Sequence, residues 1–323
     1  MIRELIKDKR VLFVTTKNLD YIRNAQEISI VERCAAKSRI IGFTDKSYAK
    51  RLVKVYWGLL REKKRDYDVI FIGFAPQLVL SFWHGKFRRH LVVIDFFISL
   101  YDTFACDRQV VGKKSLPAKL MHRIDEKTIK CADYILADTK AHSAFFTSEF
   151  AADPEKTEVL YLEADRTIYY PRKQKKGAYA DRFLVLYFGS ILPLQGVETV
   201  LEAAEILKAE NRIHFIVIGP VRKETKRYEG DHIEYIDWLP QSELAERIAM
   251  ADLCLAGHFN AHIDKAKRTI PGKAYIYEAM GKKMILGDNS ANRELFAADD
   301  RHYYVEMGNA AKLAEQIIKL AEM

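Results

Sequence analysis

The chain has few cysteines, no long apolar segment and no metal-binding pattern. Its 323 residues include four cysteines, which are scattered and form no Cys-x-x-Cys pair, as expected for a reduced protein without a zinc cluster. No apolar run approaches the roughly 20 residues that span a bilayer, and the first residues lack the apolar core of a signal peptide. His84, His90, His122 and His142 do not have metal-ligand spacing. We therefore expect a cytoplasmic protein that uses neither a metal nor another cofactor.

The charge is unevenly distributed along the chain. The net charge is +8. Residues 1–170 hold 30 Lys and Arg against 22 Asp and Glu, whereas residues 171–323 hold 22 of each, so the whole excess lies in the N-terminal half. Such a half-protein favours an anionic partner, either acidic lipid or a phosphate-bearing substrate, although a solubilising surface is the alternative. Nucleic acid is disfavoured because the chain has no RNA-recognition motif.

Apolar runs alternate with helical patterns in the C-terminal half. Strands are expected at 182–189, 213–219, 233–238, 252–257 and 284–288, and helices at 196–210, 242–250, 271–281 and 309–323. This alternation is typical of a parallel, Rossmann-like sheet.

The N-terminal half repeats this alternation. Strands are expected at 11–16, 38–43, 68–74, 90–95 and 132–139, and helices at 20–36, 48–64, 116–131, 143–150 and after Pro76. A polar, basic segment separates the two blocks. We therefore predict an N-terminal domain at 1–170, a linker at 171–182 and a C-terminal domain at 183–323.

Residues 269–288 are the most informative segment. They predict a loop, a helix opened by Pro271, a glycine stop and a short buried strand. The positive helix end leaves backbone N–H groups near Gly272, with Lys273 beside them, which suits a phosphate. Glu278 lies about two turns further along, where an acid commonly holds sugar hydroxyls, so a nucleotide or nucleotide-sugar is indicated. An ordinary crossover helix with a proline cap is the alternative.

The run PGKAYIYEAMGKKMILGD resembles the donor-binding helix of family 4 glycosyltransferases, many of which carry P-N-K-x-x-E-A-M-A-x-G-K-P-V-I-x-x-D there. The resemblance is strong from about Arg182 onward and weaker in the first 165 residues. It implies a GT-B fold, with two Rossmann-like domains whose parallel sheets face each other across a cleft. It also implies a retaining enzyme that moves a sugar from a nucleotide-sugar donor on the C-terminal side to an acceptor hydroxyl on the N-terminal side.

The loop from Gly189 to Gly196 departs from the family pattern. Family members resemble G-R…K-G there, and the Arg and Lys hold the donor diphosphate. In this chain Ser190 and Gln195 stand at those positions. Either the phosphate is held by the backbone of Gly189 and Gly196 together with Lys273, or the donor differs. Plain turn chemistry is the alternative.

The family's two glutamates, separated by seven residues, are only half present. Glu278 matches the second, to which the resemblance gives the ribose of the nucleotide. Ile270 stands at the first, which often contacts the donor sugar.

Two carboxylates follow the strand at 90–95. Asp95 ends it and Asp102 lies in the next loop. A carboxylate at this edge would take the proton from an acceptor hydroxyl or stabilise positive charge on the sugar, and Asp95 is the preferred candidate. A helix cap or a core hydrogen bond is the alternative for each.

Two basic elements of the N-terminal half are assigned to the acceptor or membrane side. Lys17 and Asn18 follow the first strand, where a plain helix cap is the alternative. The helix at 48–64 mixes Arg51, Lys54 and other cations with Leu, Tyr and Trp, which is typical of helices on acidic membrane surfaces; a core helix with a basic outer face is the alternative. We expect a lipid-linked or cell-surface glycan as acceptor and a peripheral position at the inner membrane face.

Two further functions are compatible with this sequence. One is a GT-B relative of another reaction, such as an epimerase or phosphorylase. The other is a non-catalytic nucleotide-sugar-binding or scaffold protein, because the family's loop Arg, loop Lys and first Glu are missing.

Overall fold

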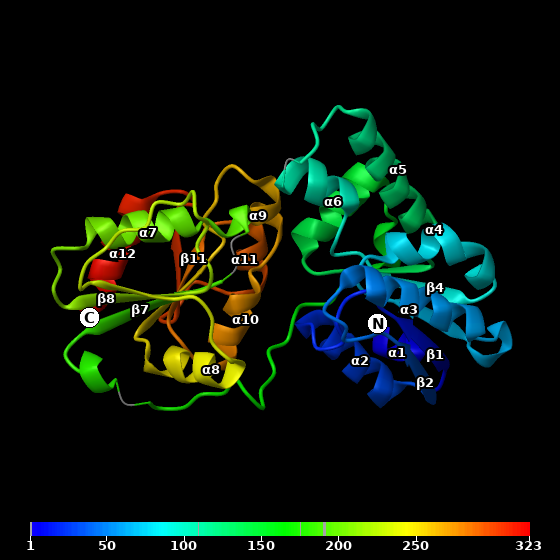
Figure 1. Cartoon of the computed structure of the whole chain (residues 1–323), viewed down its shortest axis with the longest axis horizontal. Coiled ribbons are helices and arrows are strands. Elements are labelled where there is room, and N and C mark those ends of the chain that lie inside the picture. Colours follow the sequence, from blue (N-terminus) through cyan, green and yellow to red (C-terminus); the bar gives the residue numbers. More distant parts are fainter. Residues whose placement is uncertain (1, 109, 175, 190–191) are drawn as a thin grey trace. The chain divides into compact units, whose positions relative to one another are not determined.

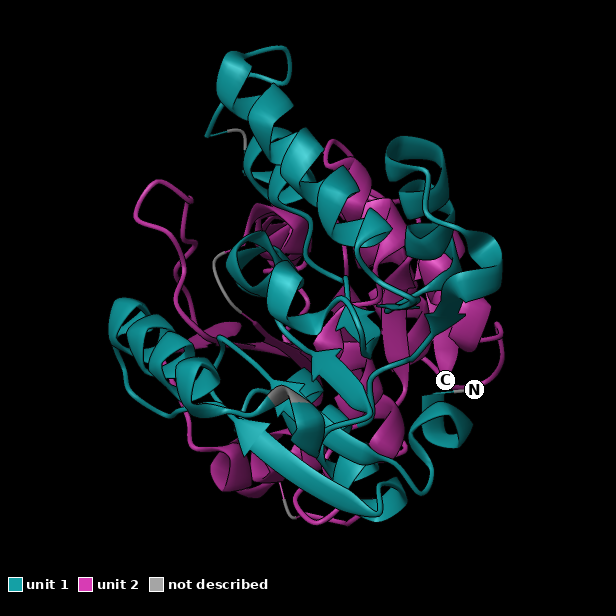
Figure 2. Cartoon of the chain, turned by 90° about the vertical axis from the view of Figure 1, so that its right-hand side faces the viewer, with its two compact units in different colours: residues 1–163 teal, residues 164–323 magenta. Residues whose placement is uncertain are grey.

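The computed structural model describes residues 2–108, 110–174, 176–189 and 192–323. The chain divides into two compact units, one up to Glu163 and one from Ala164 to Met323 (Figure 2). Each unit contains a six-stranded sheet in which all neighbouring strands are parallel. The predicted α/β class, with two Rossmann-like domains, is confirmed.

The division between the units differs from the predicted one. It follows residue 163 rather than residue 170, and the segment expected as a linker at 171–182 belongs to the second unit. Within that segment, Lys176 Nζ lies 2.6 Å from Asp252 Oδ2, and the Tyr179 hydroxyl donates to Glu234 Oε2 at 2.5 Å. These contacts attach the segment to the second sheet, so its polar composition reflects surface packing rather than a free tether.

Unit 1 is built on a sheet with the strand order β2-β1-β3-β4-β5-β6. Its strands are β1 (Arg10–Val14), β2 (Lys37–Ile41), β3 (Val69–Ile72), β4 (Leu91–Asp95), β5 (Tyr134–Ala137) and β6 (Thr157–Val159). The four inner strands β1, β3, β4 and β5 are apolar along nearly their whole length and buried on both faces, as expected for parallel strands between helical layers.

The helices of unit 1 cover both faces of this sheet. They are α1 (Ile2–Ile6), α2 (Ile22–Cys34), α3 (Tyr48–Arg61), α4 (Pro76–Phe87), a π-helical turn η2 (Asp102–Asp107), α5 (Leu116–Lys130) and α6 (Lys140–Phe150), with short 3₁₀ turns at Lys64–Asp66 and Pro154–Lys156. Apolar side chains of α1 and α2 pack on one face. Those of α3, α4, α5 and α6 pack on the other (Figure 1).

Unit 2 has the strand order β12-β11-β10-β7-β8-β9. Its strands are β7 (Phe183–Phe188), β8 (Ile213–Ile218), β9 (Ile233–Ile236), β10 (Leu253–Gly257), β11 (Met284–Gly287) and β12 (His302–Val305). In chain order this is 6-5-4-1-2-3, the arrangement of doubly wound dinucleotide-binding sheets.

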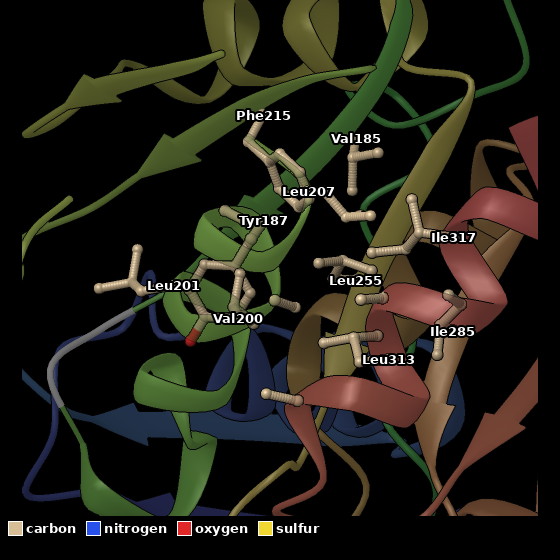
Figure 3. Packing of buried hydrophobic residues seen from close by; sticks show 14 of the residues in the cluster. Val185, Tyr187, Val200, Leu201, Leu207, Phe215, Leu255, Ile285, Leu313 and Ile317 are labelled. Atoms are coloured by element: carbon tan, nitrogen blue, oxygen red, sulfur yellow. The ribbon is translucent and has the colours of Figure 1, made fainter. Parts of the chain in front are cut away.

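The helices of unit 2 enclose a large apolar core. They are α7 (Val197–Ile206), α8 (Gln241–Met250), α9 (Asp264–Arg268), α10 (Gly272–Ala279), α11 (Ser290–Leu295) and α12 (Ala310–Ala321), with 3₁₀ turns at Gly177–Tyr179 and Pro193–Gln195. On one face of the sheet, Val200 of α7 and Leu313 of α12 pack against Val185 and Leu255 of the central strands (Figure 3). Tyr187 lies in this cluster beside Val200, so the apolar core extends to the carboxyl end of β7.

The strand orders locate one switch point in each sheet. Chain direction across the sheet reverses between β1 and β3 in unit 1 and between β7 and β10 in unit 2. Open α/β sheets bind ligands outside the carboxyl ends of the strands at this point. The loops after these four strands are therefore where a site is sought.

Every strand and helix that the periodicity predicted is present, with ends shifted by a few residues. The elements that were not predicted are short or weakly patterned. They include α1, the half-exposed edge strand β6, the π-helical turn η2 and the last strand, β12.

Candidate functional site

The switch point of unit 2 is lined by glycines that bring backbone close together. A Cβ atom at Gly189, just after β7, would collide with Gln195 Oε1 and would lie 2.9 Å from Lys273 Nζ. Gly196 caps α7 with a positive φ of 64°, and a Cβ there would lie 2.5 Å from the backbone nitrogen of Asn260. Gly196 therefore requires glycine, because of its positive φ and the nearby backbone. At Gly189 the close atoms are the ends of the Gln195 and Lys273 side chains, so this residue lies directly beside them.

Lys273 is the central side chain of this switch point. It is 5% exposed, and its Nζ donates to Gln195 Oε1 at 3.0 Å. The same oxygen accepts a hydrogen bond from the Tyr187 hydroxyl at 3.0 Å, and Lys273 Nζ lies 3.8 Å from the centre of the Tyr187 ring. Among the described residues no carboxylate forms an ion pair with this ammonium. The partners of the buried cation are thus an amide oxygen and an aromatic face.

Burial without a counter-charge changes the acidity of Lys273. Loss of solvation lowers the pKa of its amine well below the ordinary value of 10.5. A phosphate placed beside the amine would restore the missing negative charge and favour the protonated form.

Helix ends contribute further positive potential here. Gly272 and Lys273 form the first turn of α10, where no carbonyl of the helix accepts their N–H groups. A Cβ at Gly272 would meet no atom within 4 Å, so the space beside this turn is open. The helix dipole adds partial positive charge at the same end.

The loop between Gly189 and Gln195 carries the largest departure from the family pattern. Ser190 lies outside the described residues. Gln195 replaces the family's lysine, and its amide oxygen is the shared acceptor for Lys273 and Tyr187. In this chain the cation therefore comes from α10 rather than from the loop.

Glu278 does not join this site. Its carboxylate accepts from His302 Nε2 at 2.8 Å and from Arg301 at 3.3 and 3.4 Å. His302 opens β12 and pairs in register with Met284, the first residue of β11, so Glu278 lies toward the amino edge of the sheet. Lys273 lies at the carboxyl edge. The predicted ribose role of Glu278 is therefore not supported by its position.

Helical geometry explains this result. Lys273 and Glu278 are five residues apart on α10. Two such residues point about 140° apart around the helix axis and lie about 7.5 Å apart along it. In the family pattern the Glu falls five residues after the Pro and five before the Gly. In this chain Glu278 falls seven residues after Pro271 and three before Gly281, so the pattern's position is occupied by Ile276. Counting from both ends of the helix would have revealed the shift.

Asp95 forms a buried ion pair with Arg23 in the core of unit 1 and is not an accessible base. Its carboxylate is fully buried and accepts from Arg23 Nε at 2.9 Å and Nη2 at 3.0 Å. Burial alone would lower the pKa of the Arg23 guanidinium, but the Asp95 carboxylate raises it above its ordinary value. Burial, and next the charge of Asp95, raise the pKa of the neighbouring Glu27 well above its ordinary value. The predicted catalytic role of Asp95 is corrected to a structural one.

Asp102 is buried as well. It opens the π-helical turn η2, and its backbone N–H donates to Ser99 Oγ at 2.9 Å. One carboxylate oxygen lies 3.9 Å from Nε2 of His142, whose Nδ1 contacts Asp138 Oδ1 at 2.6 Å. The side chains of Asp102 and His142 are inaccessible to solvent, so the predicted role of Asp102 as a base is not supported either.

Lys17 and Asn18 do lie at the switch point of unit 1, in the loop after β1. Lys17 Nζ lies 5.6 Å from the ring centre of Tyr21 and 5.4 Å from that of Phe74, which follows β3. Tyr21 stacks on Phe97, from the loop after β4, at 6.2 Å. The Asn18 carbonyl accepts from an amide side chain of α2. The aromatic residues of this half-buried cluster were missed because they are far apart in sequence.

Arg51 and Lys54 do not form a free basic face on α3. Arg51 is 5% exposed, and its guanidinium donates to the backbone carbonyls of Thr16, Asp45 and Lys46. Lys54 Nζ pairs with Asp45 at 2.8 Å. Burial of Arg51 does not support its predicted membrane contact, whereas that of the half-exposed Lys54 stays a prediction.

The described part of the chain contains neither a metal-binding cluster nor a membrane-spanning helix. No group of three or more His, Cys, Asp or Glu side chains is arranged to hold a metal ion. None of its helices combines the length and the apolar character needed to cross a bilayer.

Unit 2 is similar in sequence to a known enzyme family. The model of the family described as "Glycosyl transferases group 1" matches residues 182–323. Residues 182–323, which make up most of unit 2, are therefore similar to group 1 glycosyltransferases. A D-inositol 3-phosphate glycosyltransferase of Segniliparus rotundus is 24% identical in sequence, in an alignment that covers 44% of this chain and 36% of that enzyme's length. One of Thermomonospora curvata is also 24% identical, over 42% of this chain and 38% of its own, so this chain spans well under half of either relative.

Solved structures resemble the chain over both units. A sucrose-phosphate synthase of Thermosynechococcus elongatus has a TM-score of 0.70 at 12% identity. HepE of Anabaena in complex with UDP has a TM-score of 0.66 at 15% sequence identity. WaaG, a glycosyltransferase involved in lipopolysaccharide biosynthesis, has a TM-score of 0.64 at 13% sequence identity. Each alignment covers 97% of this chain and 90% of the other. The chain thus has the GT-B fold that the sequence predicted.

Proposed function

We propose that the protein is a retaining glycosyltransferase that moves a sugar from a nucleotide-sugar donor to an acceptor hydroxyl. The observation that carries the proposal is the buried Lys273 ammonium at the switch point of unit 2, which has neutral partners and faces the glycine-lined end of β7. A buried charge without a counter-charge is costly unless a ligand supplies one. A donor diphosphate would do so.

Lys273 would act on the leaving group. As the bond between the sugar and the diphosphate breaks, negative charge grows on the departing oxygen. A preorganised ammonium and the N–H groups at the start of α10 would stabilise that charge more than they stabilise the intact donor. The proposal assigns no part of this neutralisation to a metal ion, so transfer is expected to continue in the presence of a chelator.

The identity of the donor is guided by relatives. HepE was crystallised with UDP and with UDP-glucose. These names support a uridine nucleotide as the first donor to test. The missing family residues Arg, Lys and first Glu leave the sugar open.

The acceptor is proposed to be a lipid-linked or cell-surface glycan bound by unit 1. Residues 1–163 hold 29 Lys and Arg against 21 Asp and Glu, a net charge of +8, whereas residues 164–323 hold 23 of each. The cluster of Lys17, Tyr21, Phe74 and Phe97 offers aromatic faces and a cation at the switch point. This combination suits a sugar ring next to an anionic group.

A thermal-shift panel of nucleotides and nucleotide-sugars tests the donor half of the proposal. At 100 to 1,000 times its dissociation constant, a uridine nucleotide should raise stability by about 3–4 kcal/mol. Radiolabelled donor with candidate glycan acceptors then tests transfer. Conversion of the donor without an acceptor would instead indicate an epimerase, and binding without any turnover would indicate a non-catalytic protein.

A further inference from the structure

The start of α5 exposes apolar and basic side chains together. Leu116 is 81% exposed and Leu120 is 60% exposed, and Val110 in the preceding loop is 68% exposed. Leu116 and Leu120 are four residues apart on α5 and therefore share one helix face. We define the α5 tip by six residues: Lys113, Lys114, Leu116, Lys119, Leu120 and Arg123.

The cations of the α5 tip are not used inside the protein. In the described part of unit 1, none of these four makes an ion pair with a carboxylate. Residues 108–124 contain five Lys or Arg and no Asp or Glu. The next two acids are already engaged, since Asp125 is buried and Glu126 pairs with Lys130 at 2.5 Å. The tip therefore carries a concentrated positive charge.

Asp125 fixes the tip to the sheet. Its carboxylate accepts from Ser99 Oγ at 2.8 Å and from the backbone N–H groups of Leu100 at 3.1 Å and Tyr101 at 2.8 Å, in the segment that follows β4. It also accepts from Gln77 of α4 at 2.7 Å. Ser115 caps α5 by accepting from the Ala118 N–H. The helical part of the tip therefore belongs to a helix that is bonded to the segment after β4 and to α4 (Figure 1).

We propose that the α5 tip docks unit 1 on an anionic lipid surface. The leucines would enter the boundary between head groups and acyl chains, and the lysines and Arg123 would meet lipid phosphates, as in amphipathic interfacial helices. The positive end of the α5 dipole points the same way. Charge complementarity selects this partner over a neutral protein surface. The inference rests on the proposed function only in taking that lipid as the place of the acceptor.

The α3 surface offers a matched comparison. Val53, Trp57 and Leu60 are 68%, 57% and 62% exposed, so their apolar area resembles that of the tip. However, Arg51 of α3 is buried and bound to backbone carbonyls, and Lys54 is paired with Asp45 at the surface. Apolar exposure is therefore similar at the two surfaces, and the tip differs in holding four cations without a carboxylate partner among the described residues, against Lys50 and Arg61 on α3.

Flotation of the full chain with lipid vesicles tests the proposal. Wild-type protein should bind vesicles of equal parts phosphatidylglycerol and phosphatidylcholine at low salt, and should bind pure phosphatidylcholine vesicles much less. Lys113→Glu/Lys114→Glu and Leu116→Ser/Leu120→Ser should each lower the bound fraction by about tenfold or more. The α3 control, Val53→Ser/Leu60→Ser, should stay within about twofold of wild type.

Three outcomes would overturn the proposal: tip variants that bind like wild type, α3 variants that lose binding instead, or wild-type protein that ignores acidic vesicles. The melting temperature without ligand is measured on every variant to confirm that each is folded, and the thermal shift with uridine nucleotide is measured separately. A missing shift with intact vesicle binding would remove the glycosyltransferase proposal and leave lipid docking in place. An intact shift without vesicle binding would remove the lipid-docking proposal and leave the glycosyltransferase proposal in place.

Discussion

Each unit buries a cation next to its switch point, and the two are handled in opposite ways. In unit 1, Arg23 is fully enclosed and bonded by Asp95, with Glu27 beside it. In unit 2, Lys273 is equally enclosed, but its polar partner is the neutral amide of Gln195. Removing one partner of a buried ion pair destabilises the fold, because the other charge is left buried alone. A buried charge that already lacks a partner weakens the fold, and such groups are common at functional sites. The comparison separates scaffold from site.

The largest effect is expected from removing the paired cation. Arg23→Met would leave the Asp95 and Glu27 carboxyl groups buried together without a counter-charge. The free energy of unfolding of unit 1 should fall by about 3–5 kcal/mol, measured by urea denaturation. Arg33→Met, on the exposed face of the same helix, should stay within about 0.5 kcal/mol of wild type. An equal effect of both changes would show that the ion pair has no special role.

The unpaired cation should behave in the opposite way. Lys273→Met keeps the length of the side chain and removes its charge, so stability without ligand should be unchanged or higher. The gain of about 3–4 kcal/mol from saturating uridine nucleotide should disappear, because the diphosphate loses its counter-charge. Thermal shift with and without nucleotide measures both quantities. Lys267→Met, an exposed control one turn before α10, should keep the full shift. A full shift in Lys273→Met would move the anion site elsewhere.

The pH dependence of stability should have opposite signs in the two units. The unfolded chain holds the Lys273 proton up to its ordinary pKa of 10.5, whereas the buried amine releases it at lower pH. Stability without ligand therefore rises with pH across that window, by up to about 1.4 kcal/mol per pH unit. Folded unit 1 holds the Glu27 proton above the ordinary pKa of 4.5, so this group makes stability fall as pH rises from there.

Denaturation as a function of pH checks both signs. Lys273→Met should flatten the rise and Glu27→Gln should flatten the fall, each relative to wild type. A variant whose curve runs parallel to that of wild type would show that the corresponding group does not titrate in that window.

The smallest effect is expected at Glu278. Its bonds to Arg301 and His302 are partly exposed, so Glu278→Gln should lower the free energy of unfolding by no more than about 1 kcal/mol. The nucleotide-induced thermal shift should persist, because the side chain lies away from Lys273. If the shift were lost, the ribose role implied by the family pattern would be restored and the assignment of the site to the carboxyl edge would need revision.

The sequence by itself determined the parts of this protein that depend on local periodicity. Apolar runs of four to six residues alternating with amphipathic segments specified two parallel sheets, and the motif around Lys273 indicated an anion site at a helix start. The uneven charge also located the basic half. These features repeat within a few residues, so pattern alone carries them.

The tertiary structure decided which polar residues are available. Asp95 looked like a base because it ends a strand, but Arg23, 72 residues earlier, neutralises it. Arg51 and Lys54 looked like a membrane face, but carbonyls and Asp45 bind them. Tyr21, Phe74 and Phe97 meet only because three loops converge at one sheet edge. Whether a charge is paired depends on contacts between residues far apart in the sequence, and a local sequence pattern does not show those contacts.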